Sequence, residues 1–190
     1  MKIYGIYLYT IDGDDARIVD SATDFSDLSW FYRSSFIEIA NFTSKQLATS
    51  QNPQENVTAD EKDFLFYAHR EGNNCSIIVS TKDYPSRAAF SILREIMKEY
   101  NKCGGNFPNG KCQTIQQGIV DYQDPTKADK LLQIQSNLDE IQKIMIMSLE
   151  KAIGRGESLK ELAEKSKELS EQSRIFVRES SKLNKCCTII

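Results

Sequence analysis

The sequence predicts an α+β domain followed by a single long coiled-coil helix. Residues 1–124 alternate between strand-like apolar runs and helical stripes that end at glycine or proline. Residues 131–184 instead place their inward-facing positions three and four apart without interruption. We therefore divide the chain into a domain at 1–124, a linker at 125–130, a coiled-coil motif at 131–184 and a tail at 185–190.

The domain begins with a predicted β-hairpin and a helix. Lys2 to Thr10 and Ala16 to Val19 are apolar runs, separated by the turn-forming sequence Asp12-Gly13-Asp14-Asp15. A helical pattern starts near Ser26, where Ser26 or Asp27 would cap it. Its inward-facing stripe is Leu28, Phe31, Tyr32, Ser35, Phe36, Ile39, Ala40 and Phe42. The polar residues 51–54 then predict a surface loop.

Three more strands and a second helix complete the predicted domain. The strands are Val57 to Glu61, Asp63 to Arg70 and Cys75 to Thr81. The middle one is apolar on both faces, which predicts a central strand covered on both sides. Tyr84-Pro85-Ser86 opens the helix, with proline in its first turn, and Gly104-Gly105 ends it. Five strands and two helices make a compact α+β domain.

The coiled-coil motif contains one residue that does not suit an apolar seam. Its layers are Leu131, Ile134, Leu138, Ile141, Met145, Ser148, Ala152, Arg155, Leu159, Leu162, Ser166, Leu169, Ser173, Phe176, Ser180 and Leu183. A bundle of identical chains would bury several guanidinium groups at the height of Arg155, where none could accept a hydrogen bond. Arg155 therefore favours a hetero-assembly whose other helices supply acceptors. The alternative is a bent helix from which Arg155 reaches into solvent.

The motif is also a weak helix by itself. Gly154 and Gly156 flank the arginine, and each glycine costs about 1 kcal/mol relative to alanine in a helix interior. Four serines occupy layer positions. We expect this helix to form when it meets its partners, by coupled folding and binding.

Composition excludes several functional classes. The chain has 190 residues, of which 40% are hydrophobic and 27% charged, and a net charge of −3. Up to Pro125 there are 12 basic and 17 acidic residues, and after it 12 basic and 10 acidic. No strong basic patch results, so we expect no nucleic-acid partner. We find neither a secretory signal nor an apolar run of about 20 residues, which predicts residence in the cytosol. Cys75, Cys103 and Cys112 show no metal or redox spacing and are interpreted as ordinary thiols.

Two features could suggest an enzyme, and both have simpler explanations. Gly105 to Lys111 has the spacing of a phosphate-binding loop, but Cys112 replaces the magnesium-binding Ser or Thr, and the loop follows a helix. His69, the single histidine, has no nucleophilic partner and is interpreted as a partly buried strand residue. We predict no catalytic residues, no metal site and no cofactor apart from covalent lipid.

The last four residues predict a lipid anchor. Cys187-Thr188-Ile189-Ile190 matches the prenylation pattern, and the adjacent Cys186 is a candidate for palmitoylation or a second lipid. One lipid chain gives reversible membrane attachment, whereas two give a stable anchor. Arg174, Arg178, Lys182 and Lys185 would add a weak attraction to anionic lipid.

Together these features resemble a known family. The arginine-centred heptads resemble an R-SNARE motif with Arg155 at the zero layer, and the domain resembles a longin domain. Its matching segments are Phe31-Tyr32-Arg33-Ser34-Ser35, Phe42-Thr43-Ser44, Asp83-Tyr84-Pro85-Ser86-Arg87 and Tyr122-Gln123-Asp124-Pro125. With the terminal cysteines, the chain is similar to the longin R-SNAREs that carry lipids instead of a transmembrane helix. The resemblance implies a profilin-like longin fold, with a five-stranded antiparallel sheet and flanking helices.

The resemblance also implies a function. One R-helix would join three Q-SNARE helices in membrane fusion on ER-Golgi, Golgi, endosomal, vacuolar or autophagic routes. The protein would divide between a cytoplasmic pool and the cytosolic face of those membranes. Phe42 would lie on a longin surface that masks the coil or the lipid in a closed form, although its spacing equally fits a plain core residue. Two alternatives remain open: a prenylated coiled-coil tether that does not drive fusion, and a lipid-anchored nucleotide enzyme built on the Gly105 loop.

Overall fold

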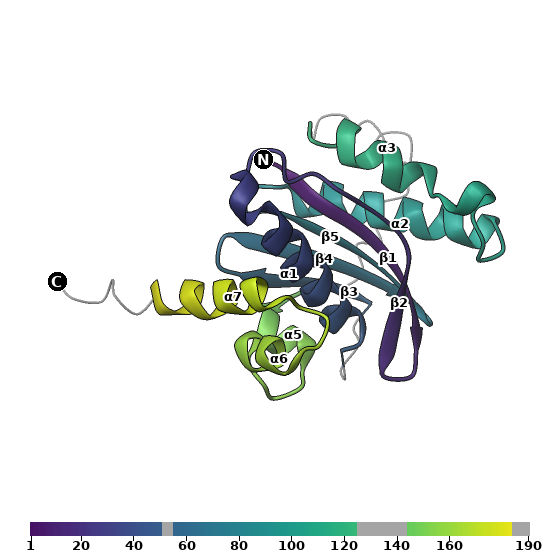
Figure 1. Ribbon diagram of the computed structural model, residues 1–190. Helices are drawn as coiled ribbons and strands as arrows, with labels where there is room; N and C mark the ends of the chain where they lie inside the picture. Colours follow the sequence, from purple (N-terminus) through teal and green to yellow (C-terminus); the bar gives the residue numbers. More distant parts are fainter. Residues whose placement is uncertain (51–54, 125–143, 184–190) are drawn as a thin grey trace.

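The computed structural model describes residues 1–50, 55–124 and 144–183, and it forms a mixed β-sheet with helices on both faces (Figure 1). The strands lie in the order β2-β1-β5-β4-β3-β6. The elements are β1 (Ile3–Asp12), β2 (Asp15–Thr23), α1 (Trp30–Ala48), β3 (Asn56–Glu61), β4 (Phe64–Glu71), β5 (Asn74–Thr81), α2 (Ser86–Lys102), the 3₁₀ turn η1 (Pro108–Gly110), α3 (Gln113–Asp121), β6 (Met145–Ser148), α5 (Leu149–Ile153), α6 (Leu159–Lys165) and α7 (Glu171–Leu183).

The first five strands are antiparallel to their neighbours and enclose two apolar layers. Side chains alternate between the faces of the sheet, so Tyr67 joins the core under α2 and α3 while its neighbour Phe66 joins the core under α1. β4 lies between β3 and β5, as its two apolar faces predict. The five predicted strands and both predicted helices are present, and each strand extends beyond its predicted ends at one or both sides.

A sixth strand was not predicted, and it comes from the coiled-coil motif. Met145–Ser148 pairs in parallel with β3, with Val57 opposite Met145 and Asp60 opposite Ser148. The edge of β3 would otherwise present unpaired backbone groups, and such an edge readily accepts another extended segment. The purely antiparallel sheet of the prediction therefore describes the first five strands but not the whole sheet.

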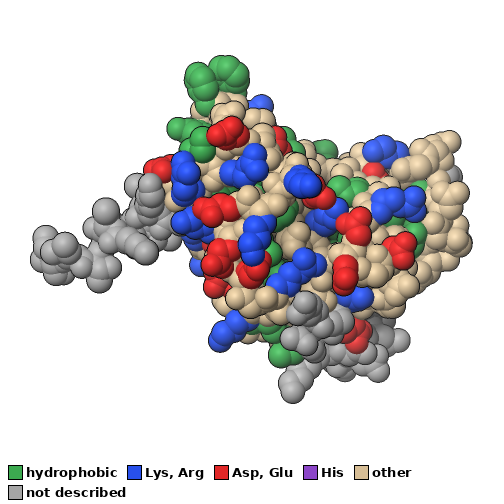
Figure 2. Space-filling view, turned by 60° about the horizontal axis from the view of Figure 1, so that its bottom comes forward, with side chains coloured by type: hydrophobic (Ala, Val, Ile, Leu, Met, Phe, Trp, Pro, Cys, Tyr) green, Lys and Arg blue, Asp and Glu red, His purple; other side chains and the backbone are tan. Residues whose placement is uncertain are grey.

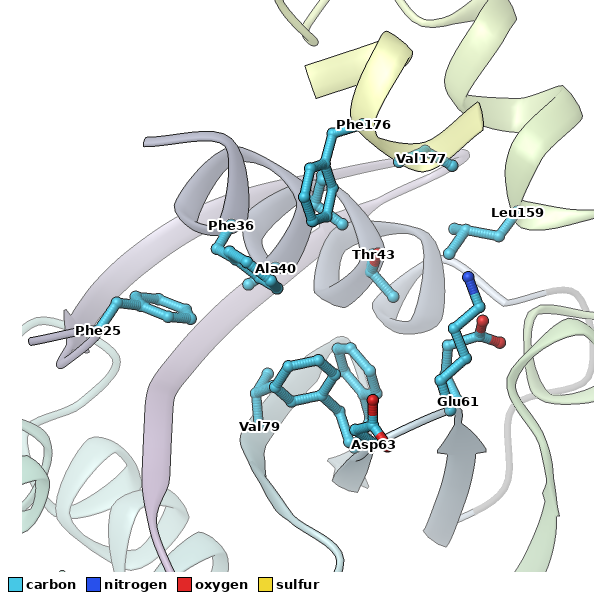
Figure 3. A pocket seen from close by; sticks show the side chains of 14 residues that line it. Phe25, Phe36, Ala40, Thr43, Glu61, Asp63, Val79, Leu159, Phe176 and Val177 are labelled. Atoms are coloured by element: carbon cyan, nitrogen blue, oxygen red, sulfur yellow. The ribbon is translucent and has the colours of Figure 1, made fainter. Parts of the chain in front are cut away.

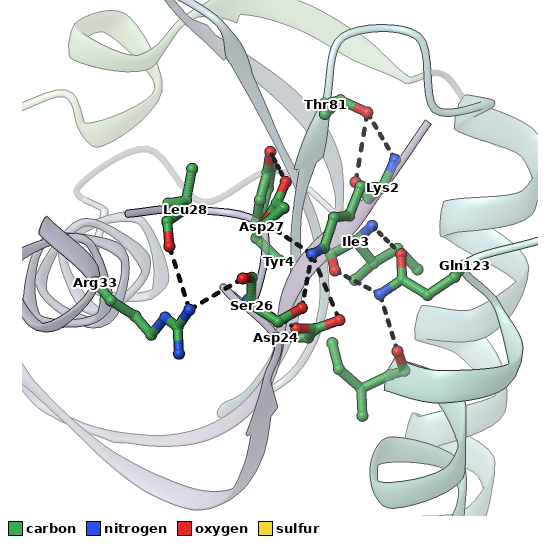
Figure 4. A network of polar contacts seen from close by, with 11 residues as sticks. Lys2, Ile3, Tyr4, Asp24, Ser26, Asp27, Leu28, Arg33, Thr81 and Gln123 are labelled. Atoms are coloured by element: carbon green, nitrogen blue, oxygen red, sulfur yellow. Dashed lines mark hydrogen bonds and ion pairs between the residues drawn. The ribbon is translucent and has the colours of Figure 1, made fainter. Parts of the chain in front are cut away.

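The first helix starts later than predicted, because its predicted cap residues have other partners (Figure 4). The carboxylate of Asp27 lies 2.8 Å from Lys2 Nζ and accepts a hydrogen bond from the Tyr4 hydroxyl. The Ser26 hydroxyl accepts a hydrogen bond from the same lysine. With both side chains bound to residues near the amino terminus, neither caps a helix, and α1 begins at Trp30.

Two residues of the predicted inward stripe of this helix are exposed. The sheet-facing residues of α1 step from Phe36 through Ala40 to Leu47. Phe31 lies five residues before Phe36, which places it about 140° around the helix at 3.6 residues per turn. Phe31 is 62% exposed and Tyr32 52% exposed. The prediction that both face the core is therefore wrong.

A third helix, α3, was also missed. Its amino terminus is held by Glu99 of α2, whose carboxylate accepts hydrogen bonds from the backbone N–H groups of Gln113 and Thr114 at 2.7 and 3.0 Å. Burial alone raises the pKa of Glu99, but the hydrogen bonds from Thr114 and Gln113 outweigh it, and the net pKa is lowered. At the other end, the side-chain amide of Gln123 bonds both the N–H and the carbonyl of Ile3 (Figure 4). The predicted break at residues 122–125 thus begins with a turn that ties α3 to β1.

The residues that resembled enzyme features have structural roles. His69 is buried in β4, with its ring nitrogens 2.9 Å from the Asn56 amide oxygen and 3.0 Å from Glu71. Lys111 of the glycine-rich loop lies 3.1 Å from the buried carboxylate of Asp20. Burial raises the pKa of the Cys75 thiol to about 12, as expected for an inert core cysteine.

Candidate functional site

The candidate functional site is the interface between α1 and residues 144–183. We call the packing of these residues against the domain the closed arrangement. In Figure 1 these residues lie beside α1 and the β3 edge, on the face of the sheet opposite α2 and α3. Three short helices and one strand replace the predicted rod. The single continuous helix predicted over residues 131–183 is therefore absent from the part of it that the structure describes.

Glycines and serines produce the breaks between these elements. Gly154 and Gly156 both have a φ of 70°, a left-handed conformation that ends α5 and that non-glycine residues rarely adopt. Ser158 then starts α6 with a capping box, in which its hydroxyl and Glu161 satisfy each other's backbone N–H groups. The Ser170 hydroxyl accepts a hydrogen bond from the Ser173 N–H at the start of α7. Gly154 and Gly156, which would weaken a long helix, thus allow this segment to fold around α1.

Most of the described layer residues are at least partly buried. Ala152, Leu169 and Ser173 are buried; Arg155, Leu159, Leu162, Ser166 and Phe176 are half-buried; Met145 and Ser148 are exposed. Leu131, Ile134, Leu138 and Ile141 lie outside the described residues, as do Cys186 and Cys187 and the side chains of Ser180 and Leu183. The same side chains that would line a four-helix bundle are therefore largely engaged inside this chain.

Arg155 lies at the carboxyl end of α1. Its guanidinium donates a hydrogen bond to the Thr49 hydroxyl at 2.9 Å, and a second, longer one at 3.4 Å to the Thr49 carbonyl. Thr49 is the residue that caps α1, so the positive charge lies at the negative end of the helix dipole. Arg155 Nε is buried without a hydrogen-bond partner. The predicted zero-layer residue therefore has one good acceptor here and unused donor capacity.

Phe42 packs against the coiled-coil segment. Together with Ala163, Leu169 and Val177 it forms a small apolar cluster that is separate from the two cores of the sheet. Phe42 is 5% exposed. The spacing of α1 could not distinguish a core residue from a surface residue at this position. The structure places Phe42 on a second face of α1, turned toward α6 and α7.

Polar contacts surround this cluster. Lys45 lies 2.7 Å from Glu168 and 2.8 Å from Asp15 of the hairpin, and hydrogen bonds to both carboxylates raise its pKa. Glu38 accepts a hydrogen bond from the backbone N–H of Ser170 at 2.9 Å. The outward side of the segment is polar: in Figure 2, acidic and basic side chains alternate over this face of the molecule. The buried side of the closed arrangement is thus apolar with a charged rim.

An apolar pocket of about 200 Å³ lies between α1, the β3–β4 turn and helices α6 and α7 (Figure 3). Phe36, Ala40 and Phe176 line it from the two helices that meet there. Glu61 lines its polar rim, and burial, followed by the nearby charge of Glu150, raises the pKa of that carboxyl. The pocket exists because the domain and the coiled-coil segment each supply part of its wall.

Several buried residues of the segment were not predicted. Leu149 and Ile153 are fully buried in the core beneath α1, and Ala163 and Val177 belong to the cluster around Phe42. None of them occupies a layer position. All four directly follow a layer, and this second apolar stripe was the signal in the sequence that could have revealed a second partner surface.

Comparison with known proteins assigns the family. The family profile described as Synaptobrevin matches residues 130–189, and the profile described as Longin, a regulated-SNARE-like domain, matches residues 25–118. Synaptobrevin homolog ykt6 of Schizosaccharomyces pombe is 31% identical, with all of both chains covered. VAMP-like protein YKT61 of Arabidopsis thaliana is 32% identical over 94% of each chain, and Synaptobrevin homolog YKT6 of Debaryomyces hansenii is 30% identical over all of both chains.

The class is therefore that of SNARE proteins with a longin domain. The chain belongs to the synaptobrevin family within it, as a homologue of Ykt6 along its whole length. It is a SNARE of vesicle fusion and not an enzyme, as predicted, and its SNARE motif implies partners that are SNAREs. Within the described residues, no helix has both the length and the apolar character required to cross a bilayer.

Proposed function

We propose that residues 131–183 supply the R-helix of a four-helix SNARE complex, with Arg155 as its zero layer, and that the closed arrangement is the resting state of this helix. One observation carries the proposal: eight of the ten layer residues with described side chains are buried or half-buried, and Arg155, Leu169 and Phe176 contact the domain directly. A side chain such as Leu169 cannot contact Phe42 and a partner helix at the same time. Assembly with three Q-SNARE helices and closure onto the longin domain therefore exclude each other.

Mixing the full chain with three Q-SNARE helices tests this proposal. We expect a slow gain of helix, measured by circular dichroism, and a complex that melts far above its separate parts. The closed chain must open before it assembles, so its apparent affinity for the Q-SNARE helices is lowered in proportion to the fraction of chains that are open. The isolated 126–185 fragment is the matched control and should assemble faster. If the helical signal does not rise for either chain, the R-helix assignment is wrong.

The tether hypothesis makes a different prediction in a vesicle assay. With the chain on one vesicle population and Q-SNAREs on the other, a fusion protein mixes the lipids of the two populations, whereas a tether only clusters the vesicles. Arg155 favours the first outcome, since a guanidinium at a buried layer needs the acceptors of a matched complex. Clustering without lipid mixing would support the tether.

We propose further that the protein attaches to membranes through a prenyl group on Cys187 and a palmitoyl group or second lipid on Cys186. The pattern Cys187-Thr188-Ile189-Ile190 supports the first modification and the adjacent cysteine the second. Such a protein would exchange between a cytoplasmic pool and Golgi, endosomal, vacuolar or vesicle membranes. Mass spectrometry of the protein from eukaryotic cells should show a prenyl mass that Cys187→Ser removes. A prenyl mass retained by Cys187→Ser would contradict the assignment.

We propose that the apolar pocket holds the prenyl chain in the closed form of the cytoplasmic pool, and that this chain leaves the pocket when the protein attaches to a membrane. Its lining is mostly apolar and comes from both halves of the chain, so a bound lipid chain would stabilise closure. Methyl NMR signals of Val79, Leu159 and Val177 in the full-length chain should shift when Cys187 is prenylated. Val120 on α3 lies outside the pocket lining and serves as the control methyl. Unchanged spectra would place the lipid elsewhere.

A further inference from the structure

Two aromatic side chains at the start of α1 form an exposed apolar knob. Trp30 is 71% exposed and Phe31 62% exposed, and their ring centroids lie 4.3 Å apart. We call this pair the aromatic knob. The two rings project together from the first turn of α1, and they belong to neither sheet core. Large contiguous apolar side chains on a surface mark interaction sites, since their exposure to water is unfavourable.

The knob lies at the end of the molecule toward which α7 runs. Contacts along α1 fix the direction of α7: Lys45 meets Glu168, and Glu38 meets Ser170. Nearer the start of α1, the rings of Tyr32 and Phe36 both contact Phe176. The segment therefore advances along α1 from its carboxyl end toward its amino end. In Figure 1 the first turn of α1 and the last turn of α7 lie on the same side of the molecule.

We propose that Trp30 and Phe31 insert into the interface of the bilayer that holds the lipid tail, and that they orient the closed protein on that membrane. The inference rests on the lipid attachment proposed above. Cys187 follows Leu183, the last residue of α7, by four residues, a reach of at most about 14 Å. A membrane held that close has a high effective concentration at the knob, so a small apolar surface is sufficient for binding.

The chemistry of the knob fits a bilayer interface. Tryptophan prefers the headgroup level, where its ring is in an apolar environment while its N–H remains hydrated. The covalent anchor and the knob would form two contacts at one end of the molecule, as stable attachment usually requires. The knob belongs to the longin domain and the tail follows the SNARE motif, so both are held together only while the chain is closed. Insertion of the knob into the bilayer is therefore expected only in a state that is both closed and membrane-bound.

Trp30 is the only tryptophan in the sequence, so its fluorescence reports on the knob alone. The first experiment uses the full chain with a carboxyl-terminal histidine tag, captured on phosphatidylcholine vesicles that contain nickel-chelating lipid. This capture imposes the attachment point without any prenyl group. We expect the emission to shift to the blue and brominated phosphatidylcholine to quench it. The proposal would be overturned if the vesicles hold the protein but its emission stays typical of water-exposed tryptophan and is not quenched.

The second experiment measures partitioning of the prenylated full chain onto phosphatidylcholine vesicles. The double variant Trp30→Ser, Phe31→Ser should bind about tenfold more weakly, because it loses much of the aromatic surface available for burial. Val120→Ser removes an equally exposed apolar side chain from α3 and should bind normally. Equal partitioning of the double variant and the parent chain would overturn the docking proposal while leaving the lipid anchor intact.

The remaining outcomes are also decisive. If the prenylated chain does not bind vesicles but the captured chain shows the blue shift, lipid attachment fails and docking stands. If both signals are absent, both proposals fail. A blue shift that grows with protein concentration in the absence of vesicles would assign the knob to contacts between copies of this chain, and would overturn membrane docking.

Discussion

The longin domain and the SNARE motif respond differently to the same kind of sequence signal. In the domain, the apolar side chains of each strand that face inward are buried mainly by other elements of the same domain, so their periodicity predicts the strands correctly. In the motif, described layer residues such as Leu169 and Phe176 contact α1, although the layer spacing is that of a bundle of long helices. A periodic apolar stripe thus specifies a buried face without specifying what buries it.

The difference has a physical origin in the breaks of the motif. A segment without Gly154, Gly156 and its core serines would gain helix stability and would not easily bend around a domain. The segment found here carries two apolar stripes, one on the layers and one directly after them, so it can bury surface in either state. Each of the following predictions shifts the balance between these two states or tests a contact that maintains it.

The largest effect is expected from Phe42→Glu. The substitution places a carboxylate in the cluster with Ala163, Leu169 and Val177, where burial of an unpaired charge adds to the loss of apolar contacts, about 3 kcal/mol or more in total. The segment should be released while the domain remains folded. Hydrogen exchange should show loss of protection in residues 144–183 and little change in β1, β4 and β5. Val120→Glu on the exposed surface of α3 is the control, and equal exchange in both variants would contradict an essential role for Phe42.

The double substitution Gly154→Ala, Gly156→Ala should also open the chain. Both glycines have positive φ in the closed arrangement, where alanine costs about 1 kcal/mol or more at each site, whereas alanine favours a continuous helix by a similar amount. We expect the helical signal of the full chain to rise and its assembly with Q-SNARE helices to accelerate. Gly72→Ala introduces the same strain in the β4–β5 turn. That variant should lower the melting temperature of the domain without increasing helicity.

A smaller effect is expected when the contact between Arg155 and Thr49 is removed. Thr49→Val eliminates the acceptor hydroxyl but keeps the side-chain shape, and it lies outside the SNARE motif. Closure should weaken by about 1–2 kcal/mol, so assembly with Q-SNARE helices should be several-fold faster while the finished complex melts at the same temperature. The Thr49 hydroxyl also bonds the Lys45 carbonyl, so a double-mutant cycle with Arg155→Gln is needed to isolate the pair. A coupling energy of zero would show that the contact contributes nothing to closure.

The comparison also explains how much of the molecule could be predicted. The five strands of the domain and its helices α1 and α2 follow from local periodicity, and α3 was missed because its apolar positions are few and its cap comes from Glu99, far away in sequence. Arg155 was identified because a charge violates an apolar pattern. Its contact with Thr49 could not be predicted, since no local pattern indicates which distant helix end offers an acceptor.

The burial of Leu149 and Ile153 and the pairing of β6 with β3 were missed for a related reason. Both depend on the choice between two partner surfaces, and that choice is made by tertiary packing. The layer spacing favours the bundle, and the second apolar stripe, which favours the domain, is visible only once the domain is considered as a competitor. A sequence with two such stripes should therefore be interpreted as a segment with two folded states.

The smallest effect concerns Glu38 at the rim of the interface. Burial alone raises the pKa of Glu38, but hydrogen bonds from Ser170 and Ser173 outweigh it and lower the net pKa below the ordinary value. A carboxyl with a lowered folded pKa stabilises the closed arrangement when ionised, and this contribution is lost as the pH falls through that pKa. Protection of residues 170–177, corrected for intrinsic exchange rates, should therefore decrease below about pH 4. Glu38→Gln should remove this pH dependence at a cost of about 1 kcal/mol or less. Asp14→Asn in the exposed β1–β2 turn should leave it unchanged, and an identical pH profile in the Glu38 variant would show that α7 is held by its apolar contacts alone.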